Sequence, residues 1–331
     1  MFPYVEVEGT HEEAGMQLGT ALRCYVIRQL QACDNYYRKE YGKSIKNMYA
    51  SARRFLPYVQ RHCPEYIQEL KGMATGAGVF LDDLLVLMCE EEIVTMVKGL
   101  LPEKCTTVGV KYRNRFMLFH NEDYDPIYNF YVVNAKIKGE PPFLSVAYMG
   151  TLPGSSAAFN ASLAFSGNAI QLTECKYGVP KNFILRKMCS LKKPEHVIAL
   201  WDATPRSIGN NMLFVTNKGI YDVEVTPDKL GVFREKKLFY HTNHLLHPCM
   251  EGIREAPSQS TDVRYARLTE LLSQQSCTPS LLFSALTDHK GLCRHKGPVH
   301  TIAASIIDLK EKSLVVYKGN PCKRNWKRFY L

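Results

Sequence analysis

The chain is predicted to be an α+β protein in which helices and strands occupy separate blocks. In residues 11–98, apolar residues recur at helical spacing, whereas from Cys105 onward short β runs alternate with turn residues. No regular βαβ alternation joins the two blocks. Blocks of this kind favour a layered α+β fold over a doubly wound parallel sheet.

The first third of the chain is expected to form a helical layer. Breaks between helices are expected at Tyr41-Gly42 and in the glycine-rich segment 72–78. Asp82 and Asp83 favour a helix start, because carboxylates stabilise helix N-termini. The apolar residues with helical spacing are Leu30, Leu56, Val59, Ile67, Leu70, Leu84, Leu85, Ile93 and Val97.

The rest of the chain is predicted to begin with a meander of strands and to continue with mixed elements. Turns are expected at Arg113-Asn114 and Lys138-Gly139. The expected strands cover 105–112, 116–120, 128–137, 143–148, 162–166, 211–216, 219–225, 300–308 and 313–317. The expected helices cover 182–191, 195–202, 262–273 and 279–286. We interpret residues 1–331 as one domain.

Composition and charge exclude several classes of protein. The net charge of +10 is dispersed, with no three Lys or Arg residues in a row, so we expect no nucleic-acid partner. A basic surface would also suit anionic substrates or a coenzyme A-like donor. No stretch approaches the roughly 20 apolar residues of a membrane span, and we expect no membrane insertion. Eleven cysteines without framework spacing fit a reducing compartment, and a cytoplasmic location is expected.

Cys105 is the first candidate for a catalytic residue. It follows the segment Leu101-Pro102-Glu103-Lys104, begins a predicted strand, and precedes Thr106 and Thr107. A cysteine thiolate is a strong nucleophile near neutral pH when a base or local field lowers its pKa. The alternative is that Cys105, one of eleven cysteines, is a small buried hydrophobic residue.

These residues resemble a known family. Cys105-Thr106-Thr107, followed eighteen residues after the cysteine by Asp123, is similar to the acyl-coenzyme A:isopenicillin N acyltransferase family of N-terminal nucleophile hydrolases (peptidase C45 type). That family includes insect hydrolases of β-alanyl amines. The similarity runs in order from about residue 9 to 326 and includes segments 70–79, 82–83, Glu90, 160–168, 211–214, Gly219, 224–227, 241–244 and 318–322.

The resemblance implies an αββα four-layer sandwich, made as an inactive precursor that cuts itself. The Cys105 thiol would attack the carbonyl of Lys104 and give fragments 1–104 and 105–331, which remain associated. The acyltransferases commonly have glycine where this chain has Lys104. The new α-amine of Cys105, with an ordinary pKa of about 8, would then serve as the general base for its own thiol.

The resemblance also implies roles for other residues. Asn243 would donate to the oxyanion of the tetrahedral intermediate, and Asp123 would orient the Cys105 amine or balance charge. The family's arginine that pairs with this aspartate has no counterpart near Pro298, and Arg294 is the nearest candidate. Residues assigned to the surroundings of the site or to substrate binding are Asn121, Thr106, Arg294 and Asn168.

Alternatives remain for two of these segments. Asp123 could be a loop carboxylate in an acidic turn. His241, His244 and His247 could form a metal site or cap a strand, but an extended strand would place His241 and His244 on opposite faces. We therefore assign no metal ligand and no resident cofactor.

Three functions are consistent with the sequence. The first is hydrolysis of a small N-acyl amide through a Cys105 acyl-enzyme. The second is acyl transfer at the same site, with acyl-coenzyme A as a candidate co-substrate. The third is an unprocessed relative that binds a ligand or partner without turnover. The sequence does not identify the acyl group, the amine or the oligomeric state.

Overall fold

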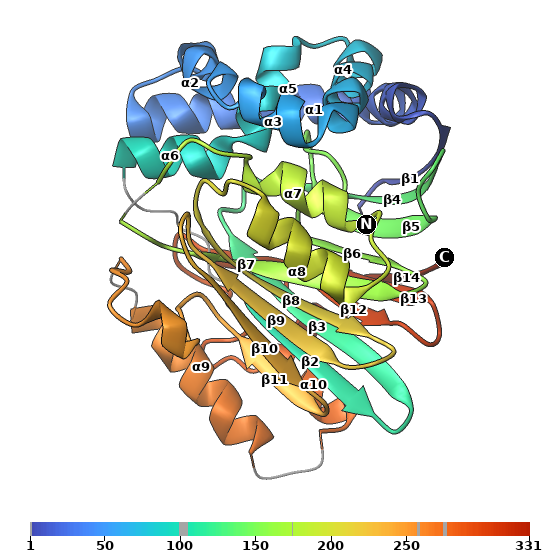
Figure 1. Cartoon of the computed structure of the whole chain (residues 1–331), viewed down its shortest axis with the longest axis vertical. Coiled ribbons are helices and arrows are strands. Elements are labelled where there is room, and N and C mark those ends of the chain that lie inside the picture. Colours follow the sequence, from blue (N-terminus) through green and yellow to red (C-terminus); the bar gives the residue numbers. More distant parts are fainter. Residues whose placement is uncertain (1, 99–104, 174, 257–258, 274–276) are drawn as a thin grey trace.

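Two β-sheets pack face to face between two layers of helices in the computed structural model (Figure 1). The structure describes residues 2–98, 105–173, 175–256, 259–273 and 277–331. Apolar residues of both sheets, among them Leu118, Val132 and Leu314, share one buried core. The expected αββα sandwich is confirmed. Lys104 lies outside the described residues, and Cys105 is the first residue described after that gap.

The first helical layer is confirmed. Thr10 caps its long first helix in a capping box with Glu13, and Gly42, with φ 65°, ends that helix at the predicted break. Of the apolar residues expected to be buried, Leu56 is half-buried and Val97 is exposed. The layer comprises α1 (His11–Tyr41), η1 (Ile45–Met48), α2 (Tyr49–Arg53), α3 (Leu56–His62), α4 (Pro64–Ala77), α5 (Leu81–Met88) and α6 (Glu90–Lys98).

The helix break predicted over residues 72–78 is wrong for most of that segment. Helix α4 continues to Ala77, and only Gly78, with φ 68°, ends it. A Cβ on Gly72 would lie 2.1 Å from the backbone oxygen of Glu12 in α1. The glycines therefore allow two helix backbones to approach closely, which a count of turn-forming residues cannot distinguish from a loop.

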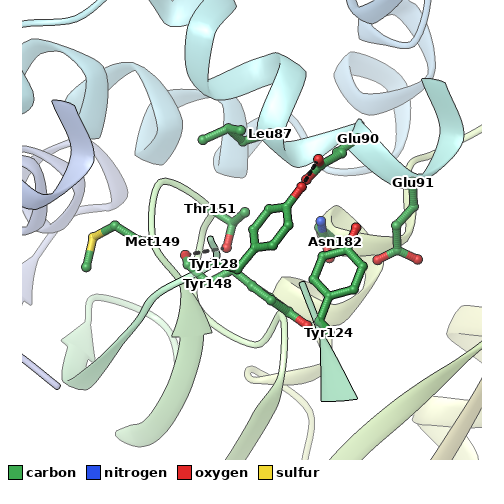
Figure 2. Close-up of a pocket in the computed structure, with 9 residues that line it drawn as sticks. All are labelled: Leu87, Glu90, Glu91, Tyr124, Tyr128, Tyr148, Met149, Thr151 and Asn182. Atoms are coloured by element: carbon green, nitrogen blue, oxygen red, sulfur yellow. Dashed lines mark hydrogen bonds between the residues drawn. The ribbon is translucent and has the colours of Figure 1, made fainter. Parts of the chain in front are cut away.

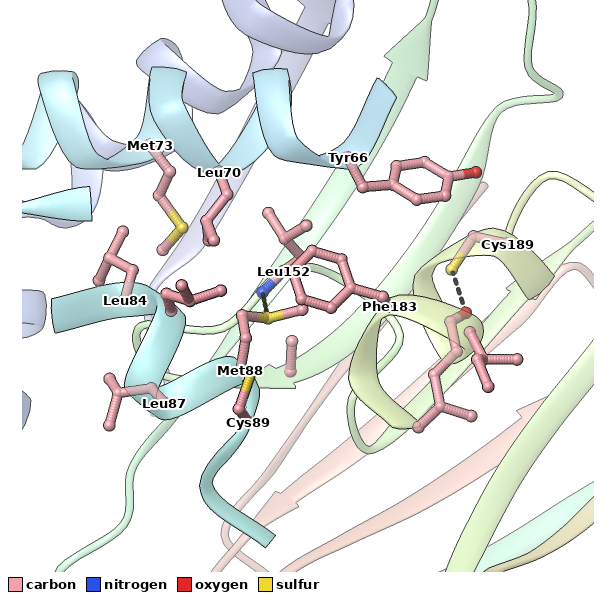
Figure 3. Close-up of a cluster of buried hydrophobic side chains, with 14 of the residues drawn as sticks. Tyr66, Leu70, Met73, Leu84, Leu87, Met88, Cys89, Leu152, Phe183 and Cys189 are labelled. Carbon is pink, nitrogen blue, oxygen red and sulfur yellow. Dashed lines mark hydrogen bonds between the residues drawn. The ribbon is translucent and has the colours of Figure 1, made fainter. Parts of the chain in front are cut away.

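Helices α5 and α7 meet in a buried apolar cluster (Figure 3). Met88 and Phe183 lie in its centre, and the Met88 sulfur accepts a hydrogen bond of 3.2 Å from the backbone N of Leu152. This cluster seats the first helical layer on the loop after β5. None of the helices in the described residues has the length and apolar character needed to cross a bilayer.

The eight-stranded sheet has the order β1-β4-β5-β6-β7-β8-β9-β10. Strand β1 pairs with β4 in parallel, and the other neighbours are antiparallel. Strands β1, β6 and β10 were not among the strands predicted from the sequence. The sheet and its two helices are β1 (Tyr4–Gly9), β4 (Phe130–Ile137), β5 (Phe143–Tyr148), β6 (Ala157–Asn160), β7 (Leu163–Ile170), α7 (Lys181–Met188), α8 (Pro194–Ala203), β8 (Gly209–Thr216), β9 (Ile220–Val225) and β10 (Leu230–Glu235).

The six-stranded sheet has the order β11-β2-β3-β12-β13-β14. Its outer face packs against two helices through a second apolar core. Sequence analysis missed β11 and β14. The elements are β2 (Thr106–Tyr112), β3 (Arg115–Tyr124), β11 (Leu238–His241), η2 (Pro248–Met250), α9 (Gln259–Leu272), α10 (Pro279–Leu286), β12 (His300–Asp308), β13 (Ser313–Lys318), η3 (Pro321–Lys323) and β14 (Trp326–Tyr330).

Strand β3 extends beyond the predicted segment 116–120. In its polar end, Asn121 pairs with Thr106 of β2 and with Ala304 of β12, and Asp123 pairs with Thr301 of β12. The alternative that Asp123 lies in an acidic turn is therefore wrong. Tertiary pairing on both edges made a strand of residues whose own β-propensity is low.

Candidate active site

Cys105 lies buried at the start of β2, with 1% of its surface exposed. The pairing of Thr106 with Asn121 brings the cysteine next to the end of β3. Its Sγ donates a hydrogen bond of 2.9 Å to Oε1 of Glu122. The hairpin of β2 and β3 therefore places the candidate nucleophile beside a carboxylate.

Glu122 is the centre of a small polar network. Its Oε2 accepts a 2.5 Å hydrogen bond from Ser156 Oγ and lies 3.1 Å from His120 Nε2. Burial alone would raise the pKa of Glu122, but the His120 charge and the hydrogen bonds from His120, Cys105 and Ser156 lower it to about 2. The group facing the Cys105 thiol is thus an ionised carboxylate. Sequence analysis did not assign Glu122 to the site.

Asp123 faces the opposite side of β3, because successive side chains of a strand alternate. Its Oδ1 accepts a hydrogen bond of 2.5 Å from Thr301 Oγ1 in β12. Burial raises the pKa of Asp123 to about 6, although the nearby charges of Arg264 and Arg294 oppose that rise. Asp123 therefore lies beside Thr301 and the two arginines, on the face of β3 opposite to Glu122.

Arg264 of α9 is a second functional candidate that was not predicted from the sequence. Its Nη1 donates to the backbone oxygen of Cys105 and, at 3.0 Å, to Thr106 Oγ1. Its Nη2 donates to Asn243 Oδ1 at 2.7 Å. Only 1% of Arg264 is exposed, and burial lowers its pKa to about 10 despite the charge of Asp123.

A signal for Arg264 was present in the sequence. Arg264, Leu268 and Leu272 recur every four residues and are all buried, so the arginine lies on the apolar face of α9. A cation on such a face needs buried partners. Arg264 therefore brings an arginine to the site from α9. The family resemblance had pointed instead to a sequence position near Pro298, where this chain has no arginine.

Arg294, the residue predicted for that place, lies at the edge of the site. Its Nη1 donates to Ser260 Oγ at 3.0 Å, and its backbone N donates to Thr301 Oγ1 at 2.8 Å. Its charge still lowers the pKa of Asp123. The charges of Arg264 and Arg294 thus both oppose the rise that burial causes in the pKa of Asp123.

The remaining predicted residues fall into two groups. Thr106 and Asn243 join Cys105 through the guanidinium of Arg264. Asn243 Nδ2 also donates to the backbone oxygen of Ala169 at 2.9 Å. Asn243 therefore links the Arg264 contacts to the end of β7.

Asn121 and Asn168 lie beside the site in separate networks. Asn121 Nδ2 donates to the backbone oxygens of Leu286 and Leu292, which fastens the segment after α10 to β3. Asn168 Oδ1 accepts from Thr107 Oγ1 at 2.8 Å, and that hydroxyl also lies 2.8 Å from His120 Nδ1. A chain of hydrogen bonds through Thr107, His120 and Glu122 thus connects Asn168 to the Cys105 thiol.

Comparison with known proteins identifies the family. A sequence profile of the acyl-coenzyme A:6-aminopenicillanic acid acyl-transferase family matches residues 110–323, well over half of the chain. The chain belongs to this family. Asp123, Asn243 and Arg264 lie inside the matched region, and Cys105 precedes it by five residues. Membership makes the chain an enzyme that acts on amide C–N bonds, by hydrolysis or acyl transfer.

Two further known proteins are similar to this chain over much of its length. Beta-alanyl-dopamine/carcinine hydrolase of Drosophila melanogaster is 25% identical over 372 residues, which cover 96% of this chain and 93% of that protein. The solved structure of a variant of conjugated bile acid hydrolase from Clostridium perfringens matches this chain with a TM-score of 0.46, and the two sequences are 11% identical. That similarity covers 69% of this chain and 97% of the other.

A pocket of this acyl-transferase family member lies between the first helical layer and the strands (Figure 2). It is a small pocket with a cavity volume of about 20 Å³, and it is lined by Leu87, Glu90, Glu91, Tyr124, Tyr128, Tyr148, Met149, Thr151 and Asn182. Tyr124 follows Glu122 by two residues in β3, so both side chains face the same side of the strand. The pocket and the Cys105 thiol therefore share one face of β3.

The carboxylates of this pocket are buried among tyrosines. Tyr37 and Tyr128 both donate hydrogen bonds to Oε1 of Glu90. Burial raises the pKa of Glu90 to about 7, against the effect of those bonds. Glu91 pairs with the Lys181 ammonium through Oε1. Its Oε2 has no hydrogen-bond partner within the described part of the chain.

The three histidines considered as metal ligands do not converge. His241 Nε2 lies 2.8 Å from Glu224 Oε1, and His244 lies beside Thr242 and Thr261. The ring of His247 instead packs against Phe233. Burial opposes protonation of His241, but the charges of Asp222 and Glu224 raise its pKa overall. The three histidines therefore make separate contacts and do not face one shared centre.

Proposed function

We propose that the chain is an autoprocessed cysteine amidohydrolase that cleaves a small N-acyl amide through a Cys105 acyl-enzyme. One observation carries this proposal: the Cys105 thiol donates to the ionised Glu122, while its own carbonyl accepts from the buried Arg264. An anionic carboxylate thus holds the thiol of Cys105, and a cationic guanidinium holds its carbonyl oxygen. Such preorganisation suits a nucleophile that must be held in one orientation.

In the first step the precursor cuts itself between residues 104 and 105. The Cys105 sulfur attacks the carbonyl of Lys104, the C–S bond forms, and the C–N bond breaks. The thiol proton ends on the new amine of Cys105, so the step is balanced. Water then hydrolyses the thioester, which gives fragments 1–104 and 105–331 of one folded domain.

In turnover the free α-amine of Cys105 takes the thiol proton as the sulfur attacks the substrate carbonyl. The Asn243 amide carries two N–H donors, and Ala169 uses one of them, so the second can serve the oxyanion. Asp123 and Arg264 balance charge behind the nucleophile. Water releases the acyl group in hydrolysis, and an amine would accept it in acyl transfer.

The substrate class follows from the pocket on the thiol's side of β3. Three tyrosine rings and the Oε2 oxygen of Glu91, which has no hydrogen-bond partner within the described part of the chain, suit a cationic group, because aromatic faces and carboxylates both attract an ammonium ion. A β-alanyl amide carries such an ammonium. The similarity to beta-alanyl-dopamine/carcinine hydrolase supports the same class.

Analysis of the purified chain by mass spectrometry and N-terminal sequencing tests the processing step. We expect two associated fragments, the larger beginning at Cys105. Cys105→Ala should stay a single chain, whereas the exposed Cys24→Ala should be cut normally. Intact wild-type protein after long incubation would favour the unprocessed binding protein, and normal cutting of Cys105→Ala would remove Cys105 as the nucleophile.

A substrate panel distinguishes hydrolysis from transfer. Processed protein is assayed with β-alanyl, other aminoacyl and fatty-acyl amides in water, and separately with acyl-coenzyme A plus amines. We expect the highest kcat/KM for amides with a cationic acyl group. A strict requirement for the thioester would instead establish the acyl-coenzyme A-dependent transferase, for which the net charge of +10 offers attraction to an anionic donor.

A further inference from the structure

Four potential metal ligands converge near the start of β12 and the end of β13 in the six-stranded sheet, outside the proposed catalytic residues. His289, Cys293 and His295 lie between α10 and β12, and Cys322 lies in η3 after β13. One ligand atom from each residue lies within 4.8 Å of each of the others. Cys293 is buried, Cys322 is half-buried, and both histidines are exposed. Two segments separate in the sequence thus contribute to one cluster.

The distances fit a tetrahedral site. Cys293 Sγ lies 3.8 Å from Cys322 Sγ and 3.5 Å from His295 Nε2, and Cys322 Sγ lies 3.3 Å from the same nitrogen. A tetrahedral Zn²⁺ with Zn–S of about 2.3 Å and Zn–N of about 2.0 Å has S–S edges of about 3.8 Å and S–N edges of about 3.5 Å. The sulfur atoms are also farther apart than the roughly 2.0 Å of a disulfide.

We propose that His289, Cys293, His295 and Cys322 form a structural binding site for a thiolate-preferring divalent metal, with Zn²⁺ as the expected ion. Two thiolates with two imidazoles select Zn²⁺ over Mg²⁺ or Ca²⁺, which prefer oxygen ligands. Four protein ligands complete a tetrahedron and leave no position for substrate, so the role is structural. Coordination turns both thiols into thiolates and releases their protons.

The surroundings of the cluster support this assignment. Asn320 Nδ2 donates to Cys293 Sγ at 3.6 Å and to the backbone oxygen of Arg294 at 2.7 Å. Donors to ligand sulfurs are a usual feature of the shell around a metal. The His289 and His295 rings lie 4.7 Å apart with an interplanar angle of 73°, an arrangement that lets one nitrogen of each face a shared centre.

The site would connect the end of β13 to the catalytic face. The segment that carries Cys293 continues into Arg294, whose backbone N donates to Thr301 Oγ1. That hydroxyl donates to Asp123. The metal therefore fastens the segment that positions Thr301 and Arg294 beside Asp123.

Metal content of the purified full-length chain tests the proposal. After gel filtration from Zn²⁺-containing buffer with reductant, we expect one tightly held Zn²⁺ per chain by elemental mass spectrometry. Cys322→Ser should lose it, while the exposed Cys249→Ser should keep it. Because Cys105 is not one of these four residues, Cys105→Ala should retain Zn²⁺ at this cluster like the wild type, which separates this test from the proposed catalysis.

Co²⁺ substitution adds a readout that does not depend on a folded cysteine variant. Wild-type protein should give the visible bands of tetrahedral Co²⁺ and a thiolate charge-transfer band, and the exposed-ligand variant His289→Ala should weaken both. Wild-type protein that retains no more Zn²⁺ than Cys322→Ser would overturn the proposal. So would a Cys293–Cys322 disulfide found by peptide mapping of protein kept in reductant.

Discussion

Replacing Arg264 with methionine should disable the site and destabilise the fold. Arg264 makes three hydrogen bonds, to the Cys105 carbonyl, Thr106 Oγ1 and Asn243 Oδ1. Hydrogen bonds to a charged group contribute about 1.5–3 kcal/mol each, but these gains are offset by the cost of burying the cation. Removing one of two interacting buried charges costs up to about 3–5 kcal/mol, and the full cost applies when the other group keeps its charge.

The other charge is Asp123, and its titration gives a second readout. Its pKa is already raised to about 6 by burial, and Arg264 opposes that rise. Without the guanidinium the pKa of Asp123 should rise further, so the carboxyl should be protonated at neutral pH. We expect the acid limb of the activity profile of Arg264→Met to move to higher pH, in addition to a fall in kcat.

Arg267→Met is the matched control, because Arg267 lies on the same helix and pairs with Asp288 and Glu270 near the surface. Ion pairs near the surface contribute much less than a buried charge, because water screens them. Urea unfolding of the two variants gives the free energies, and rates measured across pH give the profile. The reasoning fails if Arg264→Met is no less stable than Arg267→Met and retains the wild-type pH profile.

Three further predictions concern the pocket, the helix packing and the oxyanion donor. The unfolded chain loses the Glu90 proton near pH 4.5, but the folded chain holds it to about pH 7, so this group lowers stability as pH rises across that window. In urea unfolding above pH 7, Glu90→Gln should be more stable than wild type by on the order of 3 kcal/mol. Near pH 4 the two proteins should be equally stable. Equal stability at both pH values would contradict the raised pKa of Glu90. Gly72→Ala should lower the melting temperature strongly, because its Cβ would lie 2.1 Å from the backbone oxygen of Glu12. Gly219→Ala is the control, because its Cβ would lie 3.2 Å from the nearest atom, the backbone oxygen of Glu235. Its melting temperature, measured by the same calorimetry, should change little. Asn243→Ala should reduce kcat by about 100-fold or more with a smaller change in KM, and an unchanged kcat would exclude Asn243 as the oxyanion donor.

The sequence by itself determined the layered class and most of the elements. Periodicity and turn residues are local properties, so strand β5, helix α10 and strand β12 were predicted with their observed bounds. Cys105 at a strand start and Asp123 at the end of the next were also readable from spacing. Each of these features depends on residues close together in the chain.

Tertiary structure decided which polar groups face the nucleophile. Spacing favoured Asp123, but the alternation of β3 turns Glu122 toward the Cys105 thiol and Asp123 toward α9. Arg264 follows Asp123 by more than a hundred residues, and only the packing of α9 on the sheet brings the two charges together.

The same limit applies to the glycines and to the cysteine cluster. In the segment 72–78, glycine was expected to break a helix, but close approach of α1 and α4 made it a packing residue. Cys293 and Cys322 have no metal-binding spacing in the sequence, and pairing of β12 with β13 brings them within 3.8 Å. Local patterns fix what a segment forms, whereas the partners of a side chain depend on how distant segments pack.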